Sequence, residues 1–176
     1  GQLKKHENFL FLEAAVLANN AWDDLPEENT DPLEQALLEM TKEAGEEPKQ
    51  IRKGWKRLLE LPFDSKRKYM GAFCKKNEEQ ILFVKGAPDV LLDRCTSVIN
   101  PSFLGKAEKC RAKAALWGRP LLFSDRNRIL QQNDAWSKKG MRILALACRP
   151  LSEGKTGEDL AANLIFLGLA AMSDPP

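Results

Sequence analysis

The residues best suited to binding chemistry lie in one short junction, Phe83-Val84-Lys85-Gly86-Ala87-Pro88-Asp89. Its apolar residues predict a strand that ends at Lys85, and Pro88 begins a helix. Gly86 and Ala87 are small and let a ligand approach the backbone closely, and the free N–H groups at a helix start attract anions. Together with the charge of Lys85, these features indicate a site for an anionic ligand. A plain strand–turn–helix with a solvated lysine fits the same residues.

A second segment, Phe63-Asp64-Ser65-Lys66-Arg67-Lys68-Tyr69-Met70, combines an aromatic ring with three cations. The face of Phe63 can stack on a purine, an interaction worth roughly 1–3 kcal/mol. The residue types also allow Phe63 to be a core aromatic and the cations to form a solvated turn. Further upstream, the carboxylate of Glu34 can accept a hydrogen bond from an amino group, or it can simply favour the dipole of a helix start.

The elements that must position these side chains can be predicted from periodicity and turn residues. Strands over Lys68–Lys75 and Gln80–Lys85 flank the polar turn 76–79 and predict a hairpin. The remaining predicted helices are at Phe9–Asn20, from Pro32 behind an N-cap at Asp31, at 88–95 and at Asp125–Lys139. Further strands are predicted at Met141–Cys148 and Leu164–Ala171, and Lys56–Leu61 opens a strand-rich stretch. Residues 100–120 are predicted to be irregular or helical. The pattern favours an α+β fold, with an antiparallel β-sheet flanked by helices.

Bulk composition limits the possible functions. A length of 176 residues suits a single domain over 1–176. With 27 Lys and Arg against 25 Asp and Glu, the net charge of +2 gives no argument for nucleic acid or an acidic membrane surface. No apolar run approaches the roughly 18 residues of a membrane span, and no signal peptide is expected. Four cysteines without a C-x-x-C pair and one histidine predict free thiols and no metal site.

Four blocks, taken in chain order, resemble the nucleotide-binding domain of cation-transporting P-type ATPases. The junction at Lys85 resembles that family's K-G-A-P-E signature, with Asp89 in place of the usual glutamate. Asp93-Arg94-Cys95 resembles the D-R-C that follows the signature. The segment from Phe63 to Met70 is similar to the family's F-x-S-x-R-K-x-M block.

The other two blocks lie on either side. Residues 30–37 resemble G-D-P-T-E-x-A-L, with Thr30 and Leu33 in place of glycine and threonine. Residues 140–147 are similar to G-x-R-x-L-A-x-A. The single His6 is followed by Glu7, which disfavours the heavy-metal branch with its histidine–proline motif, so the resemblance is to the P2-type, calcium-pump-like branch. It extends over essentially the whole chain.

The resemblance implies an ATP site, with Mg²⁺ accompanying ATP in the intact pump. In the family, the aromatic residue stacks on adenine, the glutamate lies near the adenine amino group, the lysines line the pocket, the glycine leaves room and the arginine reaches the phosphates. The matching residues are Phe63, Glu34, Lys68, Lys85, Gly86 and Arg142.

The resemblance also implies the surroundings of the chain. The parent is expected to be an ATP-driven cation translocase of the hydrolase class, and this chain to be a cytoplasmic domain of that integral membrane protein. Phosphorylation and actuator domains would be its partners, with residues 173–176 starting the hinge to the former. The family's D-K-T-G-T motif is absent from the sequence, so the isolated chain is expected to bind ATP without hydrolysing it. Its oligomeric state is open, with a monomer as the default expectation. The sequence does not name the transported cation.

Two functions of other classes are compatible with parts of the sequence. Lys66-Arg67-Lys68 and Arg126-Asn127-Arg128 are basic clusters that a nucleic-acid-binding module could use. A protein-interaction module would show no response to nucleotide at all. The near-neutral net charge argues against the first of these alternatives.

Overall fold

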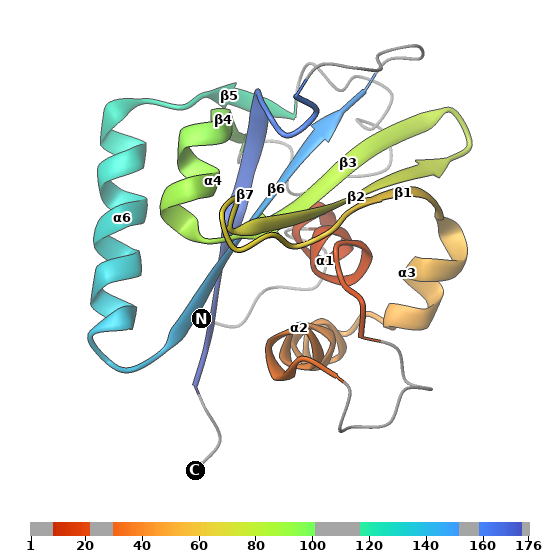
Figure 1. Cartoon of the computed structure of the whole chain (residues 1–176), viewed down its shortest axis with the longest axis horizontal. Coiled ribbons are helices and arrows are strands. Elements are labelled where there is room, and N and C mark those ends of the chain that lie inside the picture. Colours follow the sequence, from red (N-terminus) through yellow and green to blue (C-terminus); the bar gives the residue numbers. More distant parts are fainter. Residues whose placement is uncertain (1–8, 22–29, 101–116, 152–158, 174–176) are drawn as a thin grey trace.

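The computed structural model describes residues 9–21, 30–100, 117–151 and 159–173. Its centre is a seven-stranded sheet with the strand order β1-β2-β3-β6-β7-β4-β5 (Figure 1). The strands are β1 (Lys56–Leu61), β2 (Tyr69–Lys76), β3 (Glu79–Gly86), β4 (Cys95–Ile99), β5 (Gly118–Pro120), β6 (Arg142–Pro150) and β7 (Leu164–Met172). The predicted α+β class is confirmed.

The sheet is antiparallel at every neighbouring pair except β4 and β7, which are parallel. Two antiparallel steps, from β3 to β6 and from β6 to β7, make β7 run in the direction of β3. The helix that follows β3 crosses over so that β4 also runs in that direction. The parallel pair therefore results from a helical connection that the predicted antiparallel sheet did not take into account.

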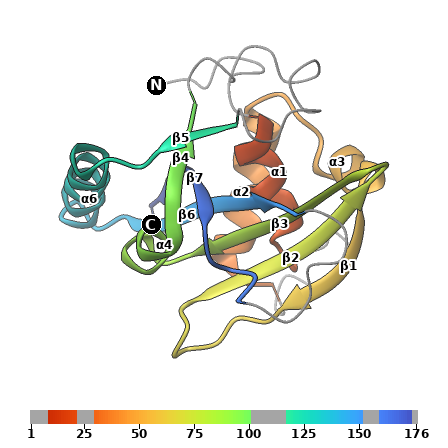
Figure 2. The same cartoon turned by 90° about the horizontal axis from the view of Figure 1, so that it is seen from above.

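Helices cover both faces of the sheet (Figures 1 and 2). One face carries α1 (Phe9–Leu17), α2 (Pro32–Glu43) and α3 (Pro48–Gly54), and the other carries α4 (Pro88–Arg94) and α6 (Phe123–Ser137). Each face has its own cluster of buried apolar side chains. The sheet is therefore the middle layer of three.

The central strand β3 shows why the sheet is covered twice. Ile81 and Phe83 belong to the cluster on the α1 side, whereas Leu82 and Val84 belong to the cluster on the α4 side. Successive strand side chains point to opposite faces, so a continuous apolar run is typical of a strand buried on both sides. This burial fixes the position of the strand end, where Lys85 and Gly86 follow.

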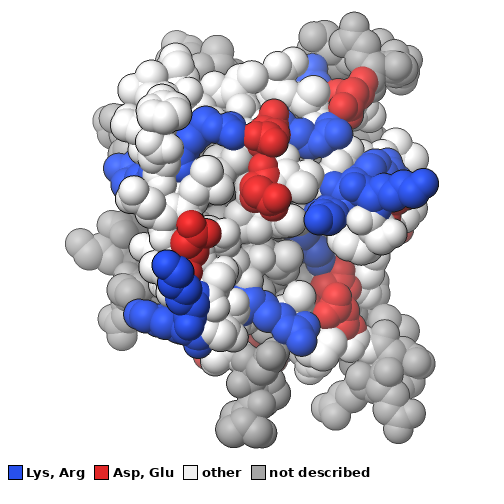
Figure 3. Space-filling view, turned by 60° about the vertical axis from the view of Figure 1, so that its left-hand side comes forward, with Lys and Arg blue, Asp and Glu red and all other residues white. Residues whose placement is uncertain are grey.

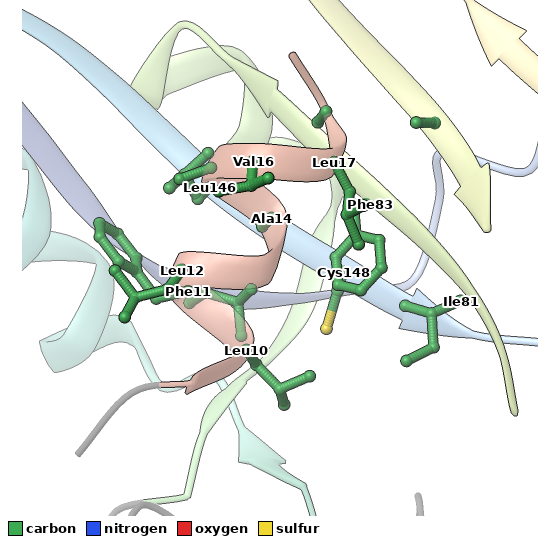
Figure 4. Close-up of a cluster of buried hydrophobic side chains, with 14 of the residues drawn as sticks. Leu10, Phe11, Leu12, Ala14, Val16, Leu17, Ile81, Phe83, Leu146 and Cys148 are labelled. Carbon is green, nitrogen blue, oxygen red and sulfur yellow. The ribbon is translucent and has the colours of Figure 1, made fainter. Parts of the chain in front are cut away.

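The cluster on the first face is built around α1, whose residues Leu10 to Leu17 are all buried (Figure 4). Figure 4 shows Val16 and Leu146 side by side, with Leu17 next to Phe83. The ring of Phe83 also meets that of Trp55 edge to face, with 5.4 Å between the centroids. α1 thus anchors β3 and β6, the two strands whose ends reach the site described below.

Several predicted boundaries change in the structure. The helix predicted over Phe9–Asn20 ends at Leu17, and α6 begins at Phe123 rather than at Asp125. The second shift arises because the Asp125 carboxylate accepts a hydrogen bond from the Leu122 N–H at 3.0 Å, which places Asp125 in the first turn instead of at its start. Strands β4 and β5 and the short helix α3 were not predicted.

Within the described ranges, no helix has both the length and the apolar character needed to cross a membrane. The same residues contain no group of three His, Cys, Asp or Glu side chains placed to hold a metal ion. Cys74, Cys95 and Cys148 are buried. Cys110 and all but the first residue of the predicted hinge at 173–176 lie outside the described residues.

Candidate functional site

A pocket of about 370 Å³ lies where β3 ends. Its walls come from the start of α2, from the loop between β1 and β2, from the end of β3 and from the start of β6. The lining residues are Asp31, Leu33, Glu34, Phe63, Lys68, Lys85, Gly86, Ala87, Ile143 and Leu144. Four segments that are distant in sequence thus meet at one cavity, and its volume lies within the range of small-molecule sites.

Five of the six predicted site residues line this pocket, and Arg142 is the exception. Arg142 is exposed and begins β6, with its Cα paired to that of Met172 on β7. The two residues after it, Ile143 and Leu144, do line the pocket. The structure therefore places Arg142 beside the pocket and not in its wall.

A buried ion pair joins two of the predicted residues. The Lys85 Nζ donates to Glu34 Oε1 at 2.5 Å, and the two residues are only 7% and 9% exposed. Burial lowers the pKa of Lys85, and the adjacent Glu34 carboxylate opposes this shift. Sequence reasoning assigned the two residues separate roles and missed that they neutralise each other across 51 positions.

Phe63 is held at the pocket with most of its side chain exposed, at 64% of its full area. It is therefore not the core aromatic that the sequence also allowed. The loop from Phe63 turns back on itself at Lys68, whose φ of 58° is uncommon for a residue with a side chain. The Lys68 carbonyl accepts a hydrogen bond from the Ala87 N–H at 3.1 Å, which ties this loop to the end of β3.

The close approach of this loop explains the glycine at position 86. A Cβ on Gly86 would lie 2.6 Å from the Lys68 carbonyl oxygen and 2.6 Å from the Tyr69 Cβ, well inside contact distance. Sequence reasoning expected the glycine to make room for a ligand. The contact that a side chain would violate is with the chain's own backbone, although Gly86 also lines the pocket.

Tyr69, directly after Lys68, is fixed by Arg94. The guanidinium carbon of Arg94 lies 4.6 Å from the centre of the Tyr69 ring, a distance typical of a cation–π contact. Arg94 also donates to the Asp159 carboxylate at 2.7 Å and to the Ala161 carbonyl at 2.8 Å. These contacts link the end of α4 to the start of β2, next to the pocket residue Lys68.

Comparison with known proteins identifies the chain. The model of the family described as P-type ATPase, cytoplasmic domain N, matches residues 9–176. The chain belongs to this family. The resemblance drawn from the four sequence blocks is thereby confirmed, and the cytoplasmic placement expected for the chain is the one that the family's description carries.

The N domain is similar to parts of several named proteins. It is 35% identical over 179 residues to calcium-transporting ATPase 1 of Lactococcus lactis, covering 99% of this chain and 19% of that protein. It is 35% identical over 168 residues to calcium-transporting ATPase 1 of Bacillus cereus, covering 95% of this chain and 17% of that protein. A probable cation-transporting P-type ATPase of Mycoplasma genitalium is 31% identical over 189 residues, and the match covers 99% of this chain and 18% of that protein. The N domain thus spans about a fifth of the length of these relatives.

The charged surface of the N domain is mixed. On the face with α6, acidic side chains lie among the basic ones (Figure 3). Arg126 donates to the Asp93 carboxylate at 2.6 Å, and Arg128 donates to Asp125 at 3.1 Å. The basic cluster 126–128, considered above for nucleic acid, therefore has both its arginines engaged with carboxylates.

Sequence reasoning missed half of the pocket wall of the N domain. Leu33, Ile143 and Leu144 were overlooked because apolar residues in a helix or strand look the same whether they face the core or a cavity. Asp31 was identified only as the N-cap of α2, a role that its hydrogen bond from the Leu33 N–H at 2.9 Å confirms. Ala87 was expected, with Gly86, to let a ligand approach the backbone, but it was not among the six predicted site residues.

Proposed function

We propose that this N domain binds ATP in the 370 Å³ pocket and serves as the nucleotide-holding part of an ATP-driven cation pump. One observation carries the proposal: an exposed aromatic ring, a lysine and a buried acid–base pair converge on one cavity from segments that the sequence separates by tens of residues. The family assignment supports the same reading.

The adenine ring would enter the pocket and stack on Phe63. Because the Phe63 side chain is 64% exposed, a base that stacks on its ring would remove apolar surface from water. Such a stack contributes roughly 1–3 kcal/mol to binding. Leu33 and Ile143 provide apolar walls for the ring edges. The Glu34 carboxylate has two oxygens and is suited to accept a hydrogen bond from the adenine amino group while it also accepts one from Lys85.

The phosphates would lie toward the outside. A cavity of about 370 Å³ is near the lower end of small-molecule pockets, so a nucleoside fits inside better than a whole triphosphate. Lys68 is exposed at the pocket wall, and Arg142 is exposed beside it. Arg142 is suited to bidentate contact with phosphate oxygens, and Mg²⁺ would accompany them in the intact pump.

The parent protein would use this site for positioning. The N domain would hold the nucleotide while the γ-phosphate is transferred to an aspartate in a separate phosphorylation domain, with the actuator domain as a further partner. Binding and orientation of this kind can supply a large part of a phosphoryl-transfer rate. The relatives' names include calcium and cation transport, and we extend cation transport to the parent. The N domain alone would be a monomeric, non-hydrolysing ATP binder over residues 1–176.

The test is a titration of ATP, with and without Mg²⁺, into the ¹⁵N-labelled N domain, followed by amide shifts. We expect a dissociation constant on the order of 1 mM. Shifts should cluster at Glu34, Phe63, Lys68 and 85–87. Phe63→Ala should weaken binding about tenfold or more, the value expected for loss of a base stack. Phe123→Ala is the matched control, because Phe123 is 79% exposed on α6 and does not line the pocket.

Two further ligands separate the parts of the site. Adenosine should shift the residues around Phe63 and Glu34, whereas tripolyphosphate should shift those around Lys68 and Arg142. If ATP shifts no pocket amide, or if Phe63→Ala and Phe123→Ala have equal effects, the proposed site is wrong. Binding of nucleic acid that falls steeply with salt would favour the basic-cluster alternative instead.

A further inference from the structure

The loop that carries Phe63 and Lys68 is organised by a residue between them. The Asp64 carboxylate Oδ1 accepts hydrogen bonds from the Lys66 N–H at 2.7 Å and from the Arg67 N–H at 3.1 Å. The Asp64 carbonyl accepts a third, from the Lys68 N–H at 2.7 Å. One residue thus binds three consecutive amides of the loop.

This arrangement fixes both ends of the loop relative to the pocket. Phe63 and Lys68 line the cavity, whereas Asp64 does not. The turn closed by Asp64 brings the chain to Lys68 in the left-handed region, at φ 58°, which a lysine does not favour unless its surroundings impose it. Hydrogen bonds from the backbone N–H groups of Arg67 and Lys66 also hold the pKa of Asp64 below its ordinary value, so the carboxylate stays charged at neutral pH.

We propose that Asp64 is a positioning residue of the nucleotide site, which holds Phe63 and Lys68 in their binding geometry before the ligand arrives. This inference rests on the proposed ATP function. Asp64 acts through its neighbours: without its carboxylate, the loop samples other conformations, and ATP must order the loop on binding. Preorganisation of this kind raises affinity by removing that ordering cost.

The experiment compares Asp64→Ala with Asp64→Asn by ATP titration. The asparagine oxygen can still accept from the two amides, whereas alanine cannot. We expect Asp64→Ala to weaken ATP binding about fivefold, from the ordering of one or two side chains, and Asp64→Asn to stay within about twofold of the original chain because its cap persists. In Asp64→Ala alone, the amides of Lys66 and Arg67 should exchange faster with solvent.

A double variant tests whether Asp64 acts through the aromatic ring. In a Phe63→Ala background, Asp64→Ala should weaken ATP binding by a smaller factor than it does in the original chain. The reason is that the Phe63 ring, which Asp64 helps to position, is already gone. Glu47→Ala is the matched control: Glu47 also caps a backbone N–H, that of Lys49 at 3.4 Å, and it does not line the pocket. It should leave ATP binding unchanged. The spread of the amide spectrum reports folding in every variant.

The outcomes separate this inference from the function beneath it. If Phe63→Ala weakens ATP binding and Asp64→Ala does not, the ATP site stands and the positioning role is overturned. If both Asp64 variants bind ATP more tightly, the carboxylate acts only by repelling phosphate, which also overturns it. If Phe63→Ala itself has no effect, the proposed function fails, and the positioning role fails with it.

Discussion

Removal of the Lys85 side chain should test whether the buried ion pair is part of the fold as well as of the site. The pair joins the end of β3 to the first turn of α2, and the Lys85 and Glu34 side chains are 9% and 11% exposed. In Lys85→Ala, the Glu34 carboxylate stays largely buried without its partner cation. The variant should therefore lose stability in addition to any loss of ATP binding.

The size of this loss follows from burial. Breaking a fully buried ion pair by removing one partner costs about 3–5 kcal/mol. Here the remaining carboxylate lines a cavity that water can enter, so about 2 kcal/mol is expected after this discount. For a domain of this size, that loss lowers Tm by roughly 4–8 °C.

A double variant distinguishes the pair from two independent residues. Lys85→Met with Glu34→Gln removes both charges and keeps similar volumes, so its stability should exceed that of Lys85→Met alone. Urea unfolding followed by tryptophan fluorescence measures this, because Trp55 and Trp117 are both buried. If the losses in unfolding free energy caused by Lys85→Met and by Glu34→Gln simply add in the double variant, the ion pair does not stabilise the fold as argued. ATP binding should remain weakened in the double variant, which would separate the role in the site from the role in folding.

Three further predictions concern the residues around the site and the core. Gly86→Ala should destabilise the N domain by about 1–3 kcal/mol in urea unfolding, because the new methyl group would lie 2.6 Å from a backbone oxygen. Cys74 and Cys95 should resist iodoacetamide at pH 8 until the chain unfolds, because burial raises the pKa of each thiol to about 12; labelling of the native chain at either position, read by mass spectrometry, would contradict this. Hydrogen bonds from Arg119 and from the backbone hold the pKa of Asp125 below its ordinary value, so the unfolded chain binds this proton more readily; the stability from Asp125 is present above about pH 4 and is lost below it. Asp125→Asn should lower Tm at pH 7 and make Tm fall less steeply as the pH drops below about 4. If the variant shows the same dependence of Tm on acidic pH as the original chain, Asp125 does not contribute this stability.

The sequence predicted which residues meet at the pocket better than it predicted how they are held there. Lys85, Gly86 and Phe63 could be found because each stands in a local pattern that needs its side-chain type. The pairing of Lys85 with Glu34 could not, because no short-range rule relates two residues 51 positions apart. The role of Gly86 was also hidden, since it depends on where the loop at Lys68 folds back.

The fold shows the same division between local and distant causes. The hairpin of β2 and β3 was predicted because its apolar runs and its polar turn are local, and Asn77 at the turn adopts φ 53°, as asparagine tolerates. Strand β5, with only three residues, has too little sequence to show a period. It exists because it pairs with β4, so its prediction requires the tertiary structure that it helps to form.

The distribution of charge around the pocket determines which end of a nucleotide we expect inside. Glu34 and Lys85 neutralise each other at the buried end, so that end has no net attraction for a phosphate. A phosphate placed there would also lose its hydration, which costs free energy. Lys68 is exposed at the pocket wall, and Arg142 is exposed beside the pocket, so among the described residues these two cations lie toward the outside of the site. A base is uncharged and gains from stacking on Phe63, whereas phosphates gain from cations that are still hydrated. We therefore expect the base to enter and the phosphates to project outward, and this orientation would leave the terminal phosphate accessible to a second domain.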